Sequence, residues 1–121
     1  MTGRFFPKKV KIFIDILLGK KAENMMLLDL RKYNGFTDWF LIATSQNIKH
    51  SQSLAELINK EAGTKGYKVR NIEGKGDGKW VVMDYNDIII HIFIQETRML
   101  YSLDRIWSGA GVYKEPWTFM E

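Results

Sequence analysis

The chain has 121 residues, of which 45% are hydrophobic and 26% are charged, with 10 Gly and only 2 Pro. This length suits a single domain with one core, and the composition excludes a disordered or low-complexity protein. The absence of Cys excludes disulfides, thiolate metal sites and cysteine nucleophiles, and it fits a reducing compartment.

The net charge of +4 is unevenly placed, because the front of the chain holds six basic residues against Asp15 alone. Such a segment predicts a polyanionic neighbour such as RNA, although a solvated, lysine-rich helix face is the simpler interpretation. The apolar run 12–18 contains Asp15 and lacks a small-residue cleavage site. We therefore expect no signal peptide and no membrane span, and we expect a cytoplasmic protein.

Helical periodicity appears in two segments. After Pro7, apolar residues recur at helical spacing and predict an amphipathic helix that ends at Gly19. A longer helix is expected from an N-cap at Ser45 or Asn47 to about residues 63–66. The inner stripe expected for the first helix is Val10, Phe13, Ile14, Leu17 and Leu18, and that for the second is Ser51, Leu54, Ala55, Ile58 and Ala62.

Strands are expected around these helices. Residues 25–30 and 39–44 are short apolar runs typical of buried central strands, and residues 68–73 predict a third strand. A hairpin follows, then a helix over residues 95–101 that is extended by the apolar residues Leu103, Ile106 and Trp107. We expect residues 98–107 to pack this closing helix against the domain.

This order of elements predicts an α/β fold: a single domain with a mixed five-stranded sheet flanked by helices. The long helix between the second and third strands permits a parallel crossover, whereas the hairpin is antiparallel. The expected domain covers residues 1–110. Residues 111–121 are expected to form an irregular tail, since glycine, proline and a lone Trp117 dominate the end of the chain.

The hairpin of residues 80–93 carries the candidate site. With Tyr85 and Asn86 as a two-residue loop, Trp80 is expected opposite His91, because Asn accepts a positive φ. One hairpin face is then wholly apolar and belongs to the core. The other face mixes carboxylates, an imidazole and an indole with apolar groups; it carries Trp80, Val82, Asp84, Asp87, Ile89, His91 and Phe93.

Several blocks along the chain resemble the Iojap or ribosomal silencing factor family of bacteria and organelles. The similarity runs from about Lys21 to Ala110, with blocks in the family's order and spacing. These blocks are residues 21–24, 28–30, 37–44, 73–74, 78–87 and 91–93, then Arg98 and residues 101–107. The sequence departs from the family pattern where Asn24 and Asn86 replace the usual Asp and Gly, where Ser45 replaces a Gly, and where residues 49–51 replace Arg-Gln-Val.

The resemblance implies a nucleotidyltransferase-like fold and a factor that binds large-subunit ribosomal protein fourteen and blocks subunit joining when nutrients are short. It implies no enzyme activity and no cofactor. A peripheral contact with ribosomal RNA and a homodimer of the free protein stay open, and no membrane partner is expected. The partner-binding residues predicted on the hairpin are Trp80, Val82, Asp84, Tyr85, Asp87 and His91, because Trp is frequent among interface hot spots.

Two other classes of function compete with this interpretation. Asp29, Asp84 and Asp87 are the carboxylates that a divergent, metal-dependent nucleotidyltransferase would use. A general RNA-binding module would use the basic front segment instead. No Gly-Ser helix entry with a following Asp-x-Asp pair is present, and Asp beside a turn commonly bonds the local backbone, so the binding factor is preferred.

Overall fold

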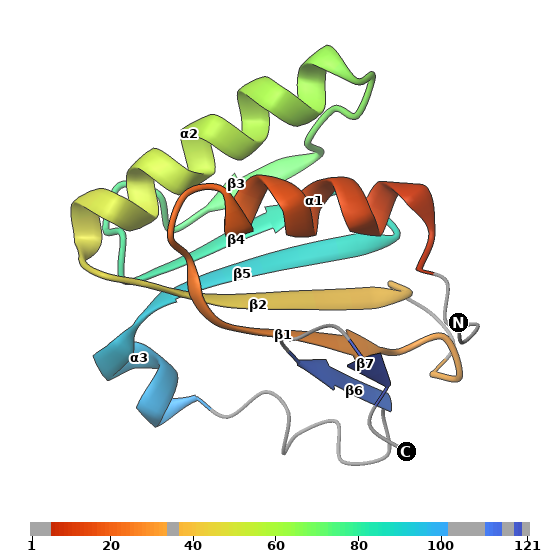
Figure 1. The fold of residues 1–121 in the computed structure, drawn as a ribbon. Coiled ribbons are helices and arrows are strands. Elements are labelled where there is room, and N and C mark those ends of the chain that lie inside the picture. Colours follow the sequence, from red (N-terminus) through yellow and green to blue (C-terminus); the bar gives the residue numbers. More distant parts are fainter. Residues whose placement is uncertain (1–5, 34–36, 102–110, 115–117, 120–121) are drawn as a thin grey trace.

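In the computed structural model, seven strands form one mixed sheet in the order β3-β4-β5-β2-β1-β6-β7. The structure describes residues 6–33, 37–101, 111–114 and 118–119. Helices α1 and α2 lie side by side on one face of the sheet, and α3 lies on the other side (Figure 1). In chain order the elements are α1 (Lys8–Leu18), β1 (Glu23–Asp29), β2 (Trp39–Ser45), α2 (Ile48–Thr64), β3 (Asn71–Glu73), β4 (Trp80–Asp84), β5 (Ile88–Ile94), α3 (Gln95–Leu100), β6 (Gly111–Lys114) and β7 (Thr118–Phe119).

The two long helices form where their periodicity predicts them. Asn47 is the N-cap of α2, and its side chain accepts a hydrogen bond of 2.8 Å from the backbone N–H of His50. The buried residues of α2 are the five predicted for its inner stripe, so this prediction is confirmed. In α1 the prediction fails at one position, since Leu18 is 40% exposed while Ile16 is buried.

The predicted mixed sheet is confirmed. Strands β2 and β5 run parallel with Trp39 opposite Ile88, and α2 lies between them in the chain, as a crossover requires. All other neighbouring pairs are antiparallel. Because β2 and β5 are central and covered on both faces, they lack polar alternation, and every residue of β2 is buried.

Two of the smaller predictions are wrong. The sheet has seven strands rather than five, because Gly111–Lys114 and Thr118–Phe119 add to the edge of β1 in the segment expected to be an irregular tail. The pairing of β6 with β1 satisfies backbone groups that would otherwise form an open edge. The third predicted strand is shorter than expected and begins at Asn71.

The hairpin register also differs from the prediction. Trp80 pairs with Phe93, and His91 pairs with Val82, which is a shift of two residues. The cause is the turn, where the N–H of Tyr85 donates to the carbonyl of Ile88 at 2.9 Å, so that Asn86 and Asp87 form the loop. Asn86 does take the expected positive φ, 78°. A shift of two preserves each side chain's face, so the predicted faces of the two strands are right although the register is wrong.

The sheet therefore separates two apolar clusters. The larger one packs β-strand side chains such as Leu41, Val81 and Ile90 under α1 and α2. The smaller one lies on the face that points away from those helices, which we call the distal face. The distal cluster consists of Met26, Leu28, Leu30, Phe40, Ile42 and Phe93, with Trp80, Ile89, Tyr33 and Val112 partly buried against it. In the part of the chain that the structure describes, no helix is long and apolar enough to cross a membrane.

Candidate partner-binding face

Trp80 stands at the start of β4 on the distal face, and three contacts fix its ring. Its indole Nε1–H donates a hydrogen bond of 3.1 Å to Nδ1 of His91. The ring stacks on Phe93 with a centroid distance of 4.9 Å and an interplanar angle of 29°. Tyr101 lies on it with a centroid distance of 4.8 Å. Trp80 is only partly buried, so it presents a rigid aromatic surface on this face.

His91 lies on β5, diagonally across from Trp80, and is only 5% exposed. Burial lowers the pKa of its imidazole to about 4, so the ring is neutral at physiological pH. Because Nδ1 accepts the indole proton, the ring's own proton sits on Nε2. Nε2 has no hydrogen-bond partner among the described residues, and the ring packs against Phe40 with a centroid distance of 4.5 Å. His91 therefore positions Trp80 rather than offering a surface of its own.

Val82 and Asp84 follow Trp80 along β4 on the same face, and both are partly exposed. Val82 pairs with His91 and extends the apolar surface. Asp84 accepts a hydrogen bond of 2.7 Å from the backbone N–H of Asn86. The Asp84 carboxylate thus stabilises the turn and also forms a polar edge of the distal face.

The other two predicted residues lie elsewhere. Tyr85 is 2% exposed and points to the helix side, where its ring meets Phe13 of α1 with a centroid distance of 4.5 Å. Burial raises the pKa of the Tyr85 phenol to about 12. Asp87 is in the turn and forms a salt bridge of 2.5 Å with Lys9, which also donates to the carbonyl of Tyr85. The structure therefore brings together Trp80, Val82, Asp84 and His91, but not Tyr85 or Asp87.

The partner-binding residues predicted from the sequence include none from α3 and not Tyr101, which directly follows it. The described part of α3 buries none of its side chains, so the expectation that residues 98–101 pack the domain is wrong for Met99 and Leu100. Met99 is 73% exposed, Leu100 is 79% exposed, and Tyr101 is 47% exposed beside Trp80. The run of three apolar or aromatic residues after Arg98 was the sequence signal that could have indicated this exposed surface. Leu103, Ile106 and Trp107 lie outside the described residues.

The three carboxylates of the competing metal-site hypothesis are not brought together. Asp29 on β1 and Asp84 on β4 are separated by β2 and β5, which is three strand spacings or roughly 14 Å. Asp29 instead accepts hydrogen bonds of 2.9 and 2.7 Å from the guanidinium of Arg31. Burial alone would raise the pKa of Asp29, but its bonds to Arg31 lower it overall. The described residues contain no group of three or more His, Asp or Glu side chains placed to hold a metal ion.

Comparison with known proteins decides the family. The family described as "Ribosomal silencing factor during starvation" matches residues 5–118. The chain belongs to this family. The resemblance seen in its sequence blocks is thereby confirmed, and ribosomal silencing factors are regulatory proteins of translation that associate with the ribosome.

Individual relatives agree with this assignment. "Ribosomal silencing factor RsfS" of Bacillus subtilis is 32% identical over 91 residues, which cover 75% of this chain and 77% of the relative. A plant relative, "Protein Iojap-related, mitochondrial" of Arabidopsis thaliana, is 25% identical over 110 residues, which cover 87% of this chain and 57% of that protein. The mouse protein "Mitochondrial assembly of ribosomal large subunit protein 1" is 24% identical over 104 residues, which cover 82% of this chain and 45% of the mouse protein.

Two solved structures share the fold. A crystal structure of a Chromobacterium violaceum protein has a TM-score of 0.80 at 23% identity and covers 84% of each chain. One from Bacillus halodurans has a TM-score of 0.74 at 28% identity and covers 81% of this chain and 91% of the other. The α/β architecture of this ribosomal silencing factor is therefore shared with proteins of known structure.

Proposed function

We propose that this ribosomal silencing factor binds the large ribosomal subunit through large-subunit ribosomal protein fourteen, with the distal face around Trp80 as its contact surface. While bound, the domain would block association of the small subunit and so repress translation under nutrient limitation. The observation that carries the proposal is the Trp80 ring, which is held rigidly yet stays partly exposed on the distal face. No chemical step and no cofactor are needed for this activity.

The physical support lies in how the face is built. Interface hot spots are rich in Trp and Tyr, and a preorganised side chain loses little entropy when it binds. Trp80 and Tyr101 are in contact, and the exposed apolar residues Met99 and Leu100 directly precede Tyr101 in the chain. Val82 extends the apolar surface along β4, and Asp84 gives it a polar edge. This arrangement of an aromatic centre with a polar edge is typical of protein interfaces.

The relatives support the choice of subunit. The printed name of the mouse protein refers to assembly of the ribosomal large subunit. A surface that selects the large subunit agrees with that name. The identity of the bound ribosomal protein and the block of subunit joining are the parts that the experiment below tests.

Helix α1 carries the basic residues that would make the RNA contact that the sequence left open. Lys8 and Lys11 are exposed on α1, which covers the face of the sheet opposite Trp80 (Figure 1). A contact of these lysines with ribosomal RNA would therefore use a surface separate from the distal face. That contact, the homodimer of the free protein and the cytoplasmic location remain predictions.

The test combines cosedimentation with separated ribosomal subunits and binding to purified large-subunit ribosomal protein fourteen. Trp80→Ala should weaken binding to large subunits and to the isolated protein by about 2 kcal/mol, or about thirtyfold in Kd. Tyr67→Ala is the matched control, because Tyr67 is a partly buried aromatic residue that packs on Phe13 of α1, on the helix side. It should leave binding unchanged.

Chemical denaturation of the same samples separates lost binding from lost folding. Trp80→Phe adds a finer test, because it keeps an aromatic ring but removes the Nε1–H donor to His91. We expect it to bind with an intermediate affinity, since the remaining ring is less firmly oriented. A folded Trp80→Ala protein that binds large subunits and blocks subunit joining as well as the parent would contradict the proposed surface.

A further inference from the structure

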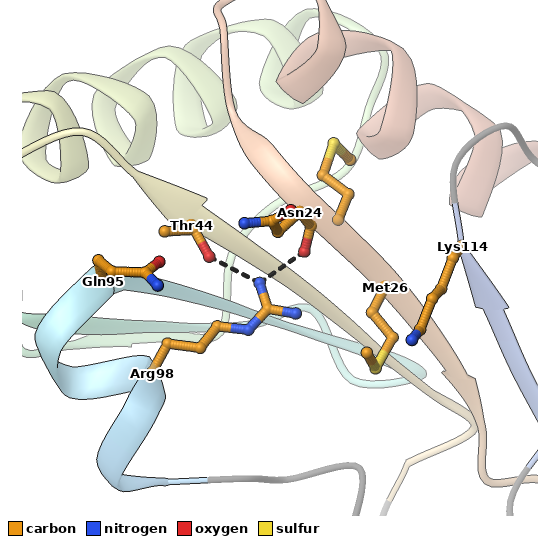
Figure 2. Close-up of a pocket in the computed structure, with 7 residues that line it drawn as sticks. Asn24, Met26, Thr44, Gln95, Arg98 and Lys114 are labelled. Atoms are coloured by element: carbon orange, nitrogen blue, oxygen red, sulfur yellow. Dashed lines mark hydrogen bonds between the residues drawn. The ribbon is translucent and has the colours of Figure 1, made fainter.

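A pocket of about 480 Å³ lies at the end of the sheet where β2 and β5 end and β1 begins. Residues of β1, β2, α3 and β6 line it, and Figure 2 shows Arg98 of α3 reaching across it toward β1 and β2. Among the described lining residues there are two cations and no carboxylate. The lining consists of Asn24, Met25, Met26, Thr44, Gln95, Arg98 and Lys114.

Arg98 is held in the pocket wall by two hydrogen bonds that join distant parts of the chain. Its Nη1 donates to the carbonyl oxygen of Asn24 at 2.5 Å and to the hydroxyl oxygen of Thr44 at 2.7 Å. Thr44 is 2% exposed, so the guanidinium is fixed against a rigid part of the central sheet. Arg98 is therefore a built feature of the pocket rather than a loose surface cation.

A distortion of β1 makes the backbone carbonyl of Asn24 available to accept the first of these hydrogen bonds. The pairing of β1 with β2 shifts between Glu23 and Met26, and Asn24 has a positive φ of 47°. A bulge of this kind breaks the regular ladder and redirects backbone groups, often beside functional sites. Here it leaves the Asn24 carbonyl to Arg98, and it places the Asn24 side-chain amide at the pocket.

Lys114 supplies the second positive charge from the other side. It lies on β6 opposite Met26, and Figure 2 shows its side chain directed toward Met26 at the side of the pocket away from Gln95. Gln95, at the start of α3, adds another amide to the lining. The pocket thus combines an ammonium, a guanidinium, two amides and a hydroxyl, which are hydrogen-bond donors of the kind that phosphate oxygens accept.

We propose that this pocket binds a phosphate group. Ligands of α/β sheets commonly bind outside the carboxyl ends of parallel strands, which is where β2 and β5 end here. The volume is within the range of small-ligand sites and exceeds what a lone phosphate would fill. The phosphate therefore belongs to a larger molecule, either a small phosphorylated compound such as a nucleotide or the backbone of RNA.

The position of the pocket is compatible with both sources of the phosphate group, a small compound and RNA. Lys114, Met26, Ile42, His91 and Val82 pair in one row across the distal face, so the pocket and the Trp80 surface share one side of the sheet. A ribosome held at Trp80 would present RNA phosphates near that side, whereas a free nucleotide needs no ribosome. The two sources make different predictions for competition, and the experiment uses that difference.

The first measurement is calorimetric titration of the full chain with inorganic pyrophosphate and with a nucleoside diphosphate. We expect saturable binding at one site. Lys114→Met should weaken it about fivefold by removing a charge, and Asn24→Asp about tenfold by placing a carboxylate beside Arg98. Asp tolerates the left-handed backbone of residue 24 nearly as well as Asn does, so Asn24→Asp should fold normally. Lys60→Met is the matched control, because Lys60 is an exposed lysine on α2.

The second measurement identifies the source of the phosphate with a single-stranded RNA of about twelve nucleotides, roughly the stretch that one small single-strand-binding module covers. If RNA supplies the phosphate, pyrophosphate displaces the RNA, and Lys114→Met makes the plot of log K against log salt shallower by about one unit. If a small compound supplies it, pyrophosphate and the nucleoside diphosphate bind but the RNA does not compete. Either result supports a phosphate pocket.

The proposal is overturned if neither pyrophosphate nor the RNA binds saturably. It is also overturned if Lys114→Met and Asn24→Asp, shown to be folded by chemical denaturation, bind both probes as tightly as Lys60→Met does. Trp80→Ala should bind pyrophosphate like the parent chain, because Trp80 does not line the pocket. The phosphate pocket and the ribosome-binding surface can therefore fail independently of each other.

Discussion

The indole N–H of Trp80 donates to Nδ1 of His91 across neighbouring strands that do not place the two residues directly opposite each other. Trp80 pairs with Phe93, so the hydrogen bond of 3.1 Å is a diagonal contact. It requires a neutral imidazole, because a protonated ring has no lone pair to accept the indole proton. The orientation of the proposed anchor is thus coupled to the protonation state of a buried histidine.

The first prediction is a loss of stability in mild acid. The pKa of His91 is lowered to about 4 in the folded protein, whereas an unfolded histidine titrates near 6.5. Below pH 6.5 the unfolded chain binds a proton that the folded chain does not bind, so this contribution to stability is complete above pH 6.5. Below pH 6.5 this contribution to stability decreases as the pH is lowered, until the pKa of His91 in the folded protein is reached. Between pH 7.5 and pH 5 the loss should be about 2 kcal/mol, measurable by urea denaturation.

The matched control for this pH series is His91→Gln, which removes the titrating group. Its free energy of unfolding should change much less between pH 7.5 and pH 5, although it should be lower than that of the parent at pH 7.5. His50→Gln tests the other histidine of the chain, and the acid sensitivity of the parent should persist in it. An equal loss of stability in the parent and in His91→Gln would show that His91 is not the sensitive group.

The second prediction concerns Tyr85, which the sequence assigned to the binding site and the structure places under α1. Its hydroxyl is buried and has no hydrogen-bond partner among the described residues. Tyr85→Phe should therefore raise the free energy of unfolding by about 1 kcal/mol, because an unsatisfied polar group is removed. Tyr85→Ala should lower it by about 3–5 kcal/mol, because its contact with Phe13 is lost and a cavity is left.

Binding assays on these Tyr85 variants test its position on the helix side. Folded Tyr85→Phe should bind large subunits with the affinity of the parent chain. A specific loss of binding in that variant, with stability retained, would return Tyr85 to the contact surface.

The contrast between Asn86 and Tyr85 shows which features the sequence could predict. Helix α2 and its buried stripe follow from local periodicity and capping, and both were predicted correctly. The positive φ of Asn86 was also predicted, but loops at residues 85–86 and 86–87 both place Asn86 in the turn. The observed loop at 86–87 goes with Tyr85 packed against Phe13, a contact between residues 72 positions apart in the chain, and local turn rules do not include such contacts.

Contacts between residues far apart in the chain also explain why some parts of the site could not be predicted from the sequence. Arg98 reaches the pocket only because β1 is distorted at Asn24, 74 positions away. Strand β6 is four residues long and begins with Gly111, so its pairing is set by the available edge of β1 rather than by strand propensity. Trp80, Val82, Asp84 and His91 could be grouped because strand alternation survives a register error of two residues.

The third prediction separates the lysines of α1. Lys9 bonds the carbonyl of Tyr85 at 2.9 Å and pairs with Asp87, so it fastens α1 to the hairpin turn. Lys9→Met should lower the free energy of unfolding by about 1 kcal/mol, since the ammonium is only partly exposed and bonds two groups. Lys8→Met is the control, because Lys8 is its exposed neighbour. A loss of stability as large in Lys8→Met as in Lys9→Met would contradict a structural role specific to Lys9.

The last prediction concerns the loop that leads into Trp80. Gly74 has a φ of 80°, and a Cβ atom added there would lie 2.1 Å from the backbone oxygen of Trp80. Because the obstacle is backbone rather than a flexible side chain, Gly74→Ala must displace the start of β4. We expect a loss of about 3 kcal/mol or more in the free energy of unfolding, from strain and steric overlap together.

Gly63→Ala is the matched control for this substitution. Gly63 is in α2, and a Cβ atom there would meet nothing within 4 Å. Alanine should therefore raise the free energy of unfolding by about 0.5–1 kcal/mol through its higher helix propensity. Urea denaturation of both variants gives the comparison, and binding to large subunits adds a second readout, since a displaced β4 would move Trp80. A Gly74→Ala protein as stable as the parent would show that the loop can yield without disturbing β4, and Trp80 would then be less rigidly placed than its contacts indicate.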